Sequence, residues 1–248
     1  MNLFEHIGRY VLMLKSVFAK PDKAKVFWDR FFNETVEIVI NSIPLIAFLS
    51  FFMGGVITIQ TASNMSSPLL PDYTIGYITR QSTILEFSPT IISLIIAGKV
   101  GSNIASEIGT MKVTEQIDAL EIMGVNSIGY LMLPKILSTT LFFPFVIVIS
   151  IVLSLIGGWF AGVTSHLYST EIYLLGIRAF WEEDQHDLYY ALGKTMVFGF
   201  LITSIASYYG YYTKGGALEV GRASTRAVVT SSVAILLANY ILTQLILI

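Results

Sequence analysis

Four long stretches of this chain contain no charged side chain. They cover residues 38–60, 136–165, 195–213 and 227–248. A helix needs about 20 apolar residues to cross the hydrocarbon of a bilayer, and each run is close to that length or longer. A fifth stretch, residues 81–97, is interrupted only by Glu86. The sequence therefore predicts an all-α polytopic membrane protein with five transmembrane helices.

The composition agrees with a membrane protein. Hydrophobic residues make up 54% of the chain and charged residues 13%, whereas about 25% of residues are charged in an average soluble domain. The net charge of -2 gives no sign of nucleic-acid binding. The chain contains no cysteine, which excludes disulfides, thiolate metal sites and cysteine nucleophiles. Its three histidines lack the spacing of a helical zinc site, so we expect no metal and no cofactor in this chain.

The first apolar run contains residues that disturb helices. Pro44 lies near its start, and Gly54 and Gly55 follow within it. Irregular backbone at membrane depth is tolerated where it packs against protein or lines a cavity. The first span is therefore expected to be either a complete crossing or a broken, re-entrant segment.

The N-terminal residues have a different pattern. Apolar side chains recur at helical spacing, at Leu3, Phe4, Ile7, Tyr10, Val11, Leu14, Val17 and Phe18. Charged residues among them exclude the uninterrupted apolar core of a signal peptide. The pattern predicts an amphipathic helix that lies in the membrane interface. We assign residues 1–35 to this interfacial region and residues 36–248 to the transmembrane region of a single domain, 1–248.

Basic residues indicate how the chain crosses the membrane. Of its 15 Lys and Arg residues, all but Arg80, Arg178 and Lys194 lie in the N-terminal segment or in the loops after the second and fourth spans. Cytoplasmic loops of membrane proteins carry an excess of Lys and Arg. We therefore expect the N-terminus and the loop after the second span in the cytoplasm. With five spans, the C-terminus would be periplasmic.

Residues 98–123, GKVGSNIASEIGTMKVTEQIDALEIM, combine small and charged side chains. We expect one helix here that continues the second span. Its charged residues must face water or another protein, because burial in lipid is costly. Small residues that recur every four positions favour close helix packing. They form two stripes, Ala97, Gly101, Ala105, Gly109 and Gly98, Ser102, Ser106, Thr110, and the pair Gly158, Gly162 repeats the device in the third span.

Glu86 is the only acidic residue well inside an apolar span. A charged carboxylate that faces lipid near the bilayer centre costs about 2.5 kcal/mol or more, so this side chain is expected to point into the bundle or into a hydrated cavity. Both a functional role and a structural polar contact fit this position. The chain has no second intramembrane acid, no G-x-S-x-G motif and no complete P-loop. We expect no catalytic residues.

Two ordered blocks of the chain carry a recognisable pattern. The first block comprises LEFSP at 85–89, AGKVGS at 97–102, SEIGTM at 106–111, TEQIDAL at 114–120 and MG at 123–124. The second comprises GGA at 215–217 and VGRASTRAVV at 220–229. Together with the five-span layout, these blocks resemble the MlaE family, the permease subunits of ABC transporters for lipids.

This resemblance implies a homodimeric permease of an ATP-driven phospholipid transporter in the bacterial inner membrane. Its partners would be a cytoplasmic ABC ATPase, which binds ATP and magnesium, and a periplasmic MCE-type binding protein, and phospholipid would move between the inner and outer membranes. By position, residues 107–123 would form the coupling helix, which contacts the ATPase through Glu107, Met111, Glu115, Gln116 and Asp118. The lipid cavity would be lined by Glu86, Gly54 and Ile57.

The chain departs from the family pattern at three positions. Leu85 and Lys99 each replace an Arg, and Ser88 replaces a Gly. The first change removes the cation next to Glu86, and Lys99 keeps a charge without the planar guanidinium that binds phosphate through two bonds. Two other functions remain open, namely a membrane anchor or scaffold for an MCE protein and an intramembrane enzyme that modifies lipid.

Overall fold

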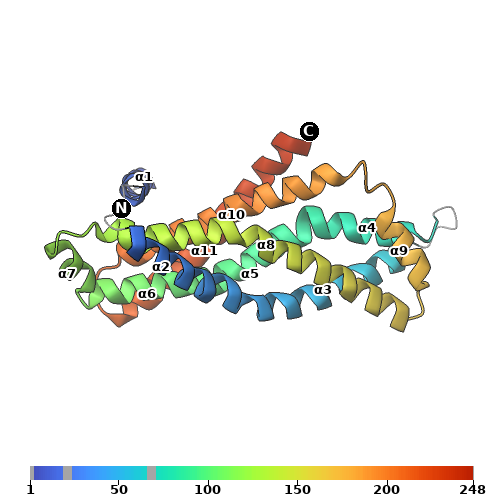
Figure 1. Ribbon diagram of the computed structural model, residues 1–248, viewed down its shortest axis with the longest axis horizontal. Coiled ribbons are helices and arrows are strands. Elements are labelled where there is room, and N and C mark those ends of the chain that lie inside the picture. Colours follow the sequence, from blue (N-terminus) through green and yellow to red (C-terminus); the bar gives the residue numbers. More distant parts are fainter. Residues whose placement is uncertain (1–2, 19–23, 66–70, 248) are drawn as a thin grey trace. The chain divides into compact units, whose positions relative to one another are not determined.

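The computed structural model describes residues 3–18, 24–65 and 71–247, and Figure 1 shows that the elements in these residues are helices. Five of the helical stretches are long and apolar enough to cross a membrane. They are Ala24–Asn64, Thr74–Val113, Ser127–Thr164, Gln185–Tyr211 and Ala217–Leu245. This confirms the prediction of an all-α polytopic membrane protein with five spans. The chain ends and part of the predicted region 1–35 lie outside the described residues.

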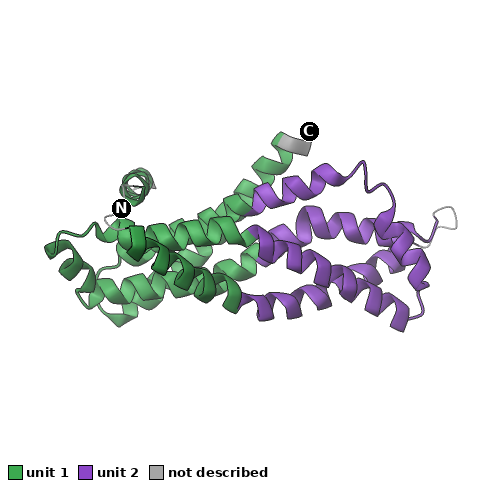
Figure 2. Cartoon of the chain, in the orientation of Figure 1, with its two compact units in different colours: residues 1–41, 93–143, 196–248 green, residues 42–92, 144–195 purple. Residues whose placement is uncertain are grey.

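The described residues form eleven α-helices and short irregular helical turns, and α1, α7 and α9 lie outside the five spans. The α-helices are α1 (Leu3–Val17), α2 (Ala24–Glu34), α3 (Ile43–Asn64), α4 (Thr74–Ser82), α5 (Ile92–Ile96), α6 (Ser102–Val113), α7 (Gln116–Ile122), α8 (Ser127–Thr164), α9 (Thr170–Arg178), α10 (Gln185–Tyr211) and α11 (Ala217–Leu247). They divide into two compact units, coloured separately in Figure 2. Unit 1 comprises residues 1–41, 93–143 and 196–248, and unit 2 comprises residues 42–92 and 144–195.

The first span is one continuous helical stretch. Between α2 and α3 the chain forms a π-helical turn, Thr35–Val39, and a 3-10 turn, Ile40–Ser42, and Pro44 lies in the first turn of α3. Proline is tolerated there, because the first N–H groups of a helix have no partner within it. The described backbone is therefore helical without a gap over residues 24–64, as a complete crossing requires.

In unit 2, glycines bring α3 and α8 into close contact. A Cβ atom on Gly54 would lie 1.8 Å from the carbonyl oxygen of Ser154, and one on Gly157 would lie 1.8 Å from that of Phe51. Only residues without a side chain allow the two backbones to approach this closely. The expected packing role of Gly158 is confirmed, since its Cβ would lie 2.4 Å from the hydroxyl of Thr58.

In unit 1, the first small-residue stripe packs α6 against α10 and α11. Its members, Ala97, Gly101, Ala105 and Gly109, are all buried. A Cβ atom on Gly210 of α10 would lie 2.8 Å from the carbonyl oxygen of Ala105, and one on Gly109 would lie 3.2 Å from Val220 of α11. The predicted close packing is therefore confirmed for this stripe. The second stripe is more accessible, and its last member, Thr110, is exposed.

Helix α1 rests on α10 within unit 1. His6 Nδ1 lies 2.8 Å from the Tyr208 hydroxyl, and the Tyr10 hydroxyl lies 2.7 Å from Ser204 Oγ. Burial raises the pKa of the Tyr10 phenol. Other apolar side chains of α1 stay exposed, including Phe4 at 85%. The predicted N-terminal helix is thus present, and its exposed apolar side chains suit a membrane interface.

Candidate functional site

Glu86 lies where the second span departs from α-helical geometry. A π-helical segment, Thr83–Ile91, follows α4 and contains both Glu86 and Pro89. Pro89 has no N–H to donate, so the carbonyl of Leu85, four residues earlier, cannot receive its usual helical hydrogen bond. Single π-helical turns occur frequently at functional sites.

Lys194 of α10 contacts both an acidic side chain and a carbonyl oxygen of this π-helical segment. Its Nζ lies 3.0 Å from Glu86 Oε1 and donates to the Leu85 carbonyl oxygen at 3.1 Å. Thr90 Oγ1 donates to the other carboxylate oxygen of Glu86 at 3.0 Å. A charged Lys inside an apolar bundle requires such partners. Glu86 of the second span and Lys194 of the fourth, both in unit 2, therefore form an ion pair.

The two members of this pair differ in exposure. The side chain of Lys194 is 0% exposed, whereas that of Glu86 is 44% exposed. The pair therefore presents a polar, hydrogen-bonding carboxylate surface, with the ammonium group behind it.

Sequence reasoning missed Lys194. The sequence pattern places it only among the basic residues opposite the cytoplasmic loops and does not pair it with Glu86; the structure places it in α10. The available signal was that Glu86 and Lys194 are two isolated charges of opposite sign near apolar runs, and such charges tend to pair. Their contact depends on the packing of α10 against the π-helical segment, which periodicity does not reveal.

Two of the predicted cavity residues lie elsewhere. Gly54 is buried against the backbone of Ser154, and Ile57 is 6% exposed. In the single chain the glycine serves the close approach of α3 and α8, and the place of both residues in a cavity of the assembled transporter stays a prediction. The exposed side of α3 instead consists of apolar residues, among them Phe48, Phe52 and Val56, which are 63%, 56% and 58% exposed.

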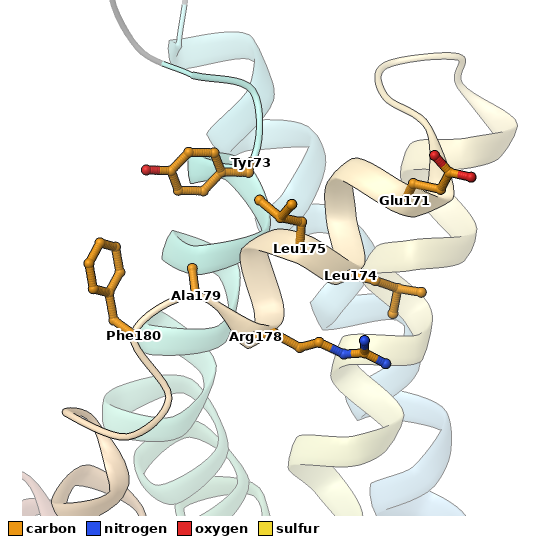
Figure 3. Close-up of a pocket in the computed structure, with 7 residues that line it drawn as sticks. All are labelled: Tyr73, Glu171, Leu174, Leu175, Arg178, Ala179 and Phe180. Carbon is orange, nitrogen blue, oxygen red and sulfur yellow. The ribbon is translucent and has the colours of Figure 1, made fainter.

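A concave surface of unit 2 lies over α9. This pocket, about 670 Å³ in volume, is drawn in Figure 3 and is lined by Tyr73, Glu171, Leu174, Leu175, Arg178, Ala179 and Phe180. Most of its lining side chains are apolar, and Glu171 and Arg178 add one charge of each sign. The pocket thus combines an apolar floor with a polar rim.

Arg80 anchors α9 beside this pocket. Its Nη1 donates to the carbonyl oxygens of Ile177 and Ala179 at 2.7 and 2.9 Å, and its Nη2 forms an ion pair with Asp184. These carbonyls lie at the C-terminus of α9, where a cation is favoured by the helix dipole. The fully buried Arg80 therefore fixes the end of α9 on α4.

The polar stretch after the second span is two helices. Helix α6 ends at Val113, and α7 begins at Gln116. Glu115 between them has a φ of 59°, a left-handed conformation that ends helical hydrogen bonding. The expectation of one helix over residues 98–123 is therefore wrong, and with it the single coupling helix 107–123. Gly124, with a φ of 77°, ends α7 in turn.

The predicted coupling residues are distributed over both helices. Glu107 and Met111 lie on α6, Glu115 lies in the turn, and Gln116 and Asp118 lie on α7. Glu107 has an internal partner, since Lys135 Nζ of α8 lies 2.8 Å from its carboxylate and 2.7 Å from that of Glu34. Lys135 is 1% exposed. Glu107 therefore holds α6 to its neighbours, and the structure places no other predicted coupling residue in this buried cluster.

Helix α7 presents apolar side chains that sequence reasoning did not select. Ile122 is 88% exposed and Met123 is 68% exposed, while Ile117 is fully buried and anchors the helix. Around them, Lys112 pairs with Asp118 at 2.5 Å, and Glu121 accepts a hydrogen bond from Tyr211 at 2.9 Å. An exposed apolar patch with a charged rim is typical of a protein contact.

Comparisons with known proteins agree with this layout. The family model of Permease MlaE matches residues 31–245. A probable ABC transporter permease protein of Rickettsia bellii is 34% identical over 245 residues, which cover 99% of this chain and 93% of that protein. Another from Synechocystis is 36% identical over 194 residues, 78% of this chain and 73% of that protein. The Arabidopsis thaliana protein TRIGALACTOSYLDIACYLGLYCEROL 1, chloroplastic, is 30% identical over 227 residues, 90% of this chain and 63% of that protein. With this coverage, the chain belongs to the MlaE permease family and is a membrane permease subunit of the ABC transporter type.

Proposed function

We propose that this protein is the membrane subunit of an ATP-driven transporter that moves phospholipid between the inner and outer membranes of a bacterium. The observation that carries the proposal is the half-exposed Glu86 held by the buried Lys194 within apolar spans. A phospholipid has both a polar head group and apolar tails, and such a site offers polar contacts inside an apolar bundle. Because every charge at this depth is costly, an ion pair here points to a ligand path.

The energy source is proposed to be a separate cytoplasmic ABC ATPase, which would bind ATP and magnesium. The exposed Ile122, the last residue of α7, and Met123, which follows it, are the proposed contact for a groove of that ATPase. Asp118 and Glu121 lie on the same short helix and supply a charged rim. Of the predicted coupling residues, this proposal keeps Met111, Glu115, Gln116 and Asp118 at or near the contact and moves Glu107 to an internal role.

The working form is proposed to be a homodimer, with the periplasmic MCE-type protein as the third component. The exposed apolar side of α3 would meet its own copy about a two-fold axis, which makes the interface self-complementary. The pocket over α9 in Figure 3 is a candidate contact for the MCE-type protein. By the proposed orientation, α9 faces the periplasm, as does the C-terminus.

The experiment is reconstitution of this chain with its ATPase and its MCE-type protein in proteoliposomes. We expect transfer of a fluorescent phospholipid that requires ATP. Capture of the MCE-type protein without any ATP-dependent transfer would contradict the proposal and support a scaffold. A chemically altered lipid would instead indicate an enzyme.

A matched pair of variants tests the ATPase contact in the same preparation. Ile122→Asp places a charge in the apolar patch of α7 and should abolish co-purification of the ATPase. Leu167→Asp, at an exposed position outside the spans, should leave co-purification unchanged. Normal capture of the ATPase by Ile122→Asp would remove α7 as the contact.

A further inference from the structure

Helix α7 is separated from its neighbours along the chain by two breaks in the backbone. Glu115 before the helix and Gly124 after it have φ angles of 59° and 77°. Helical hydrogen bonding therefore does not run from α6 into α7 or from α7 into α8. Side-chain contacts must determine which spans move with α7.

One carboxylate on α7 holds two other spans. Glu121 Oε1 accepts a hydrogen bond from Ser127 Oγ at 2.8 Å and from the Tyr211 hydroxyl at 2.9 Å. Ser127 is the first residue of α8, and Tyr211 is the last residue of α10. Hydrogen bonds to an ionised carboxylate are about twice as strong as those between neutral groups. Glu121 thus connects α7 to the ends of two helices through a single oxygen.

A second polar contact of α7 joins it to α6 rather than to α8 or α10. Lys112 of α6 pairs with Asp118, and the two side chains are 30% and 49% exposed. Ion pairs in this environment are screened by salt and contribute little. The Lys112 Nζ also lies 5.8 Å from the centre of the Tyr211 ring, so the same tyrosine is approached from α6.

We propose that Glu121 is the positioning residue that makes α8 and α10 follow α7, with Tyr211 as its partner on α10. Helix α10 is continuous from Gln185 to Tyr211, and it carries Lys194, the partner of Glu86. A displacement of α7 by a docked ATPase would therefore reach α10 at its Tyr211 end. This inference rests on the proposed function, because it requires an ATPase that docks at α7.

The test compares Tyr211→Phe with Tyr212→Phe in the complete complex. Both changes keep the ring and remove one hydroxyl, but only that of Tyr211 bonds to Glu121. The first readout is the number of ATP molecules hydrolysed for each lipid transferred. The second, measured on the permease without its partners, is the mobility of a spin label at Met123→Cys, since the chain has no other cysteine.

We expect Tyr211→Phe to bind the ATPase at wild-type yield, to need several-fold more ATP for each lipid, and to free the spin label. Tyr212→Phe should match the wild type in both readouts. Glu121→Gln keeps an acceptor for the tyrosine and should be closer to the wild type than Glu121→Ala.

The inference is overturned if Tyr211→Phe changes neither readout, changes only one of them, or behaves like Tyr212→Phe. Failure of the proposed function gives a different result, since the wild-type complex would then show no ATP-dependent transfer or no bound ATPase. The spin-label readout does not depend on transport, so it remains informative in that case: an unchanged label in Tyr211→Phe overturns the inference by itself.

Discussion

Lys194 and Glu86 form an ion pair in which only one partner is screened by solvent. Because Lys194 is buried and Glu86 is half exposed, the two single removals are not equivalent. Removal of the carboxylate leaves a buried ammonium, whereas removal of the ammonium leaves a carboxylate that can be hydrated. The contact is thus a structural requirement for Lys194 and leaves Glu86 able to meet a ligand.

This asymmetry gives a prediction for stability. Glu86→Gln should lower the unfolding temperature of the detergent-solubilised permease more than Lys194→Met does, and the double variant should recover much of the loss. Removing one partner of a fully buried ion pair costs about 3–5 kcal/mol. The loss of stability in Glu86→Gln should be smaller than this, because Glu86 is half exposed. Equal losses in the two single variants, or a double variant that is less stable than both, would contradict it.

Lys135 gives a second prediction at this scale. Its ammonium serves the two carboxylates of Glu34 and Glu107, which are 12% and 39% exposed. Lys135→Met should destabilise the permease by up to about 3 kcal/mol, mainly because it leaves the nearly buried Glu34 without its cation. Lys112→Met, which removes a pair at the surface, should cost less than about 1 kcal/mol. Thermal unfolding of both variants provides the measurement. If Lys135→Met loses as little stability as Lys112→Met, the cluster of Lys135, Glu34 and Glu107 is hydrated and the prediction is wrong.

At the scale of elements, close contacts between helices depend on glycine residues, which have no side chain. Gly157 of α8 faces the backbone of Phe51 on α3, so no rotamer change can relieve a clash there. Gly157→Ala should therefore separate the helices and destabilise the protein by about 1–3 kcal/mol or more. Gly221→Ala on α11 meets no atom within 4 Å and should be neutral or stabilising by up to about 1 kcal/mol. A neutral Gly157→Ala in a thermal unfolding assay would contradict the close approach of α3 and α8.

The spans were predictable from the sequence, but their interruptions were not. The thickness of the hydrocarbon core sets the minimum length of a transmembrane helix, and the uncharged residues 136–165 exceed that length. The break at Glu115 carries no local signal, because glutamate in a left-handed conformation is stabilised by surrounding structure rather than by its own preference. The resemblance assigns Gly54 to a lipid cavity, and its contact with α8 could not be predicted, since a glycine at a helix contact and one at a cavity look alike in sequence.

The candidate site was predictable in part, for the same reason. Glu86 could be selected because an isolated acid in a span is costly. Lys194 and Tyr211 could not, since both depend on where α10 lies beside helices that are distant in sequence. Resemblance to the MlaE family predicts that the polar stretch after the second span contacts the ATPase. In the structure, Glu107 of this stretch instead forms an ion pair with the buried Lys135.

At the scale of the whole molecule, the exposed apolar surface is too large for a chain in water and requires lipid or a second copy. On α3 it includes Phe52, whereas Ile57 on the same helix is buried. If the homodimer forms through the exposed side of α3, Phe52→Cys should cross-link to its own copy with a short reagent, and Ile57→Cys should not. Non-reducing electrophoresis of membranes provides the measurement. Cross-linking by Leu237→Cys of α11 but not by Phe52→Cys would move the two-fold axis to α11.

The most direct test of the central claim is ATP-dependent transfer of a labelled phospholipid by complexes that carry either the wild-type permease or the double variant Glu86→Gln, Lys194→Met. The double variant lacks both charges, so it should assemble and bind the ATPase while the carboxylate surface is absent. We predict ATP-dependent transfer by the wild type and a loss of most of it in the double variant. Transfer by the double variant at the wild-type rate, or no ATP-dependent transfer by the wild type, would contradict the claim that this ion pair serves lipid transport.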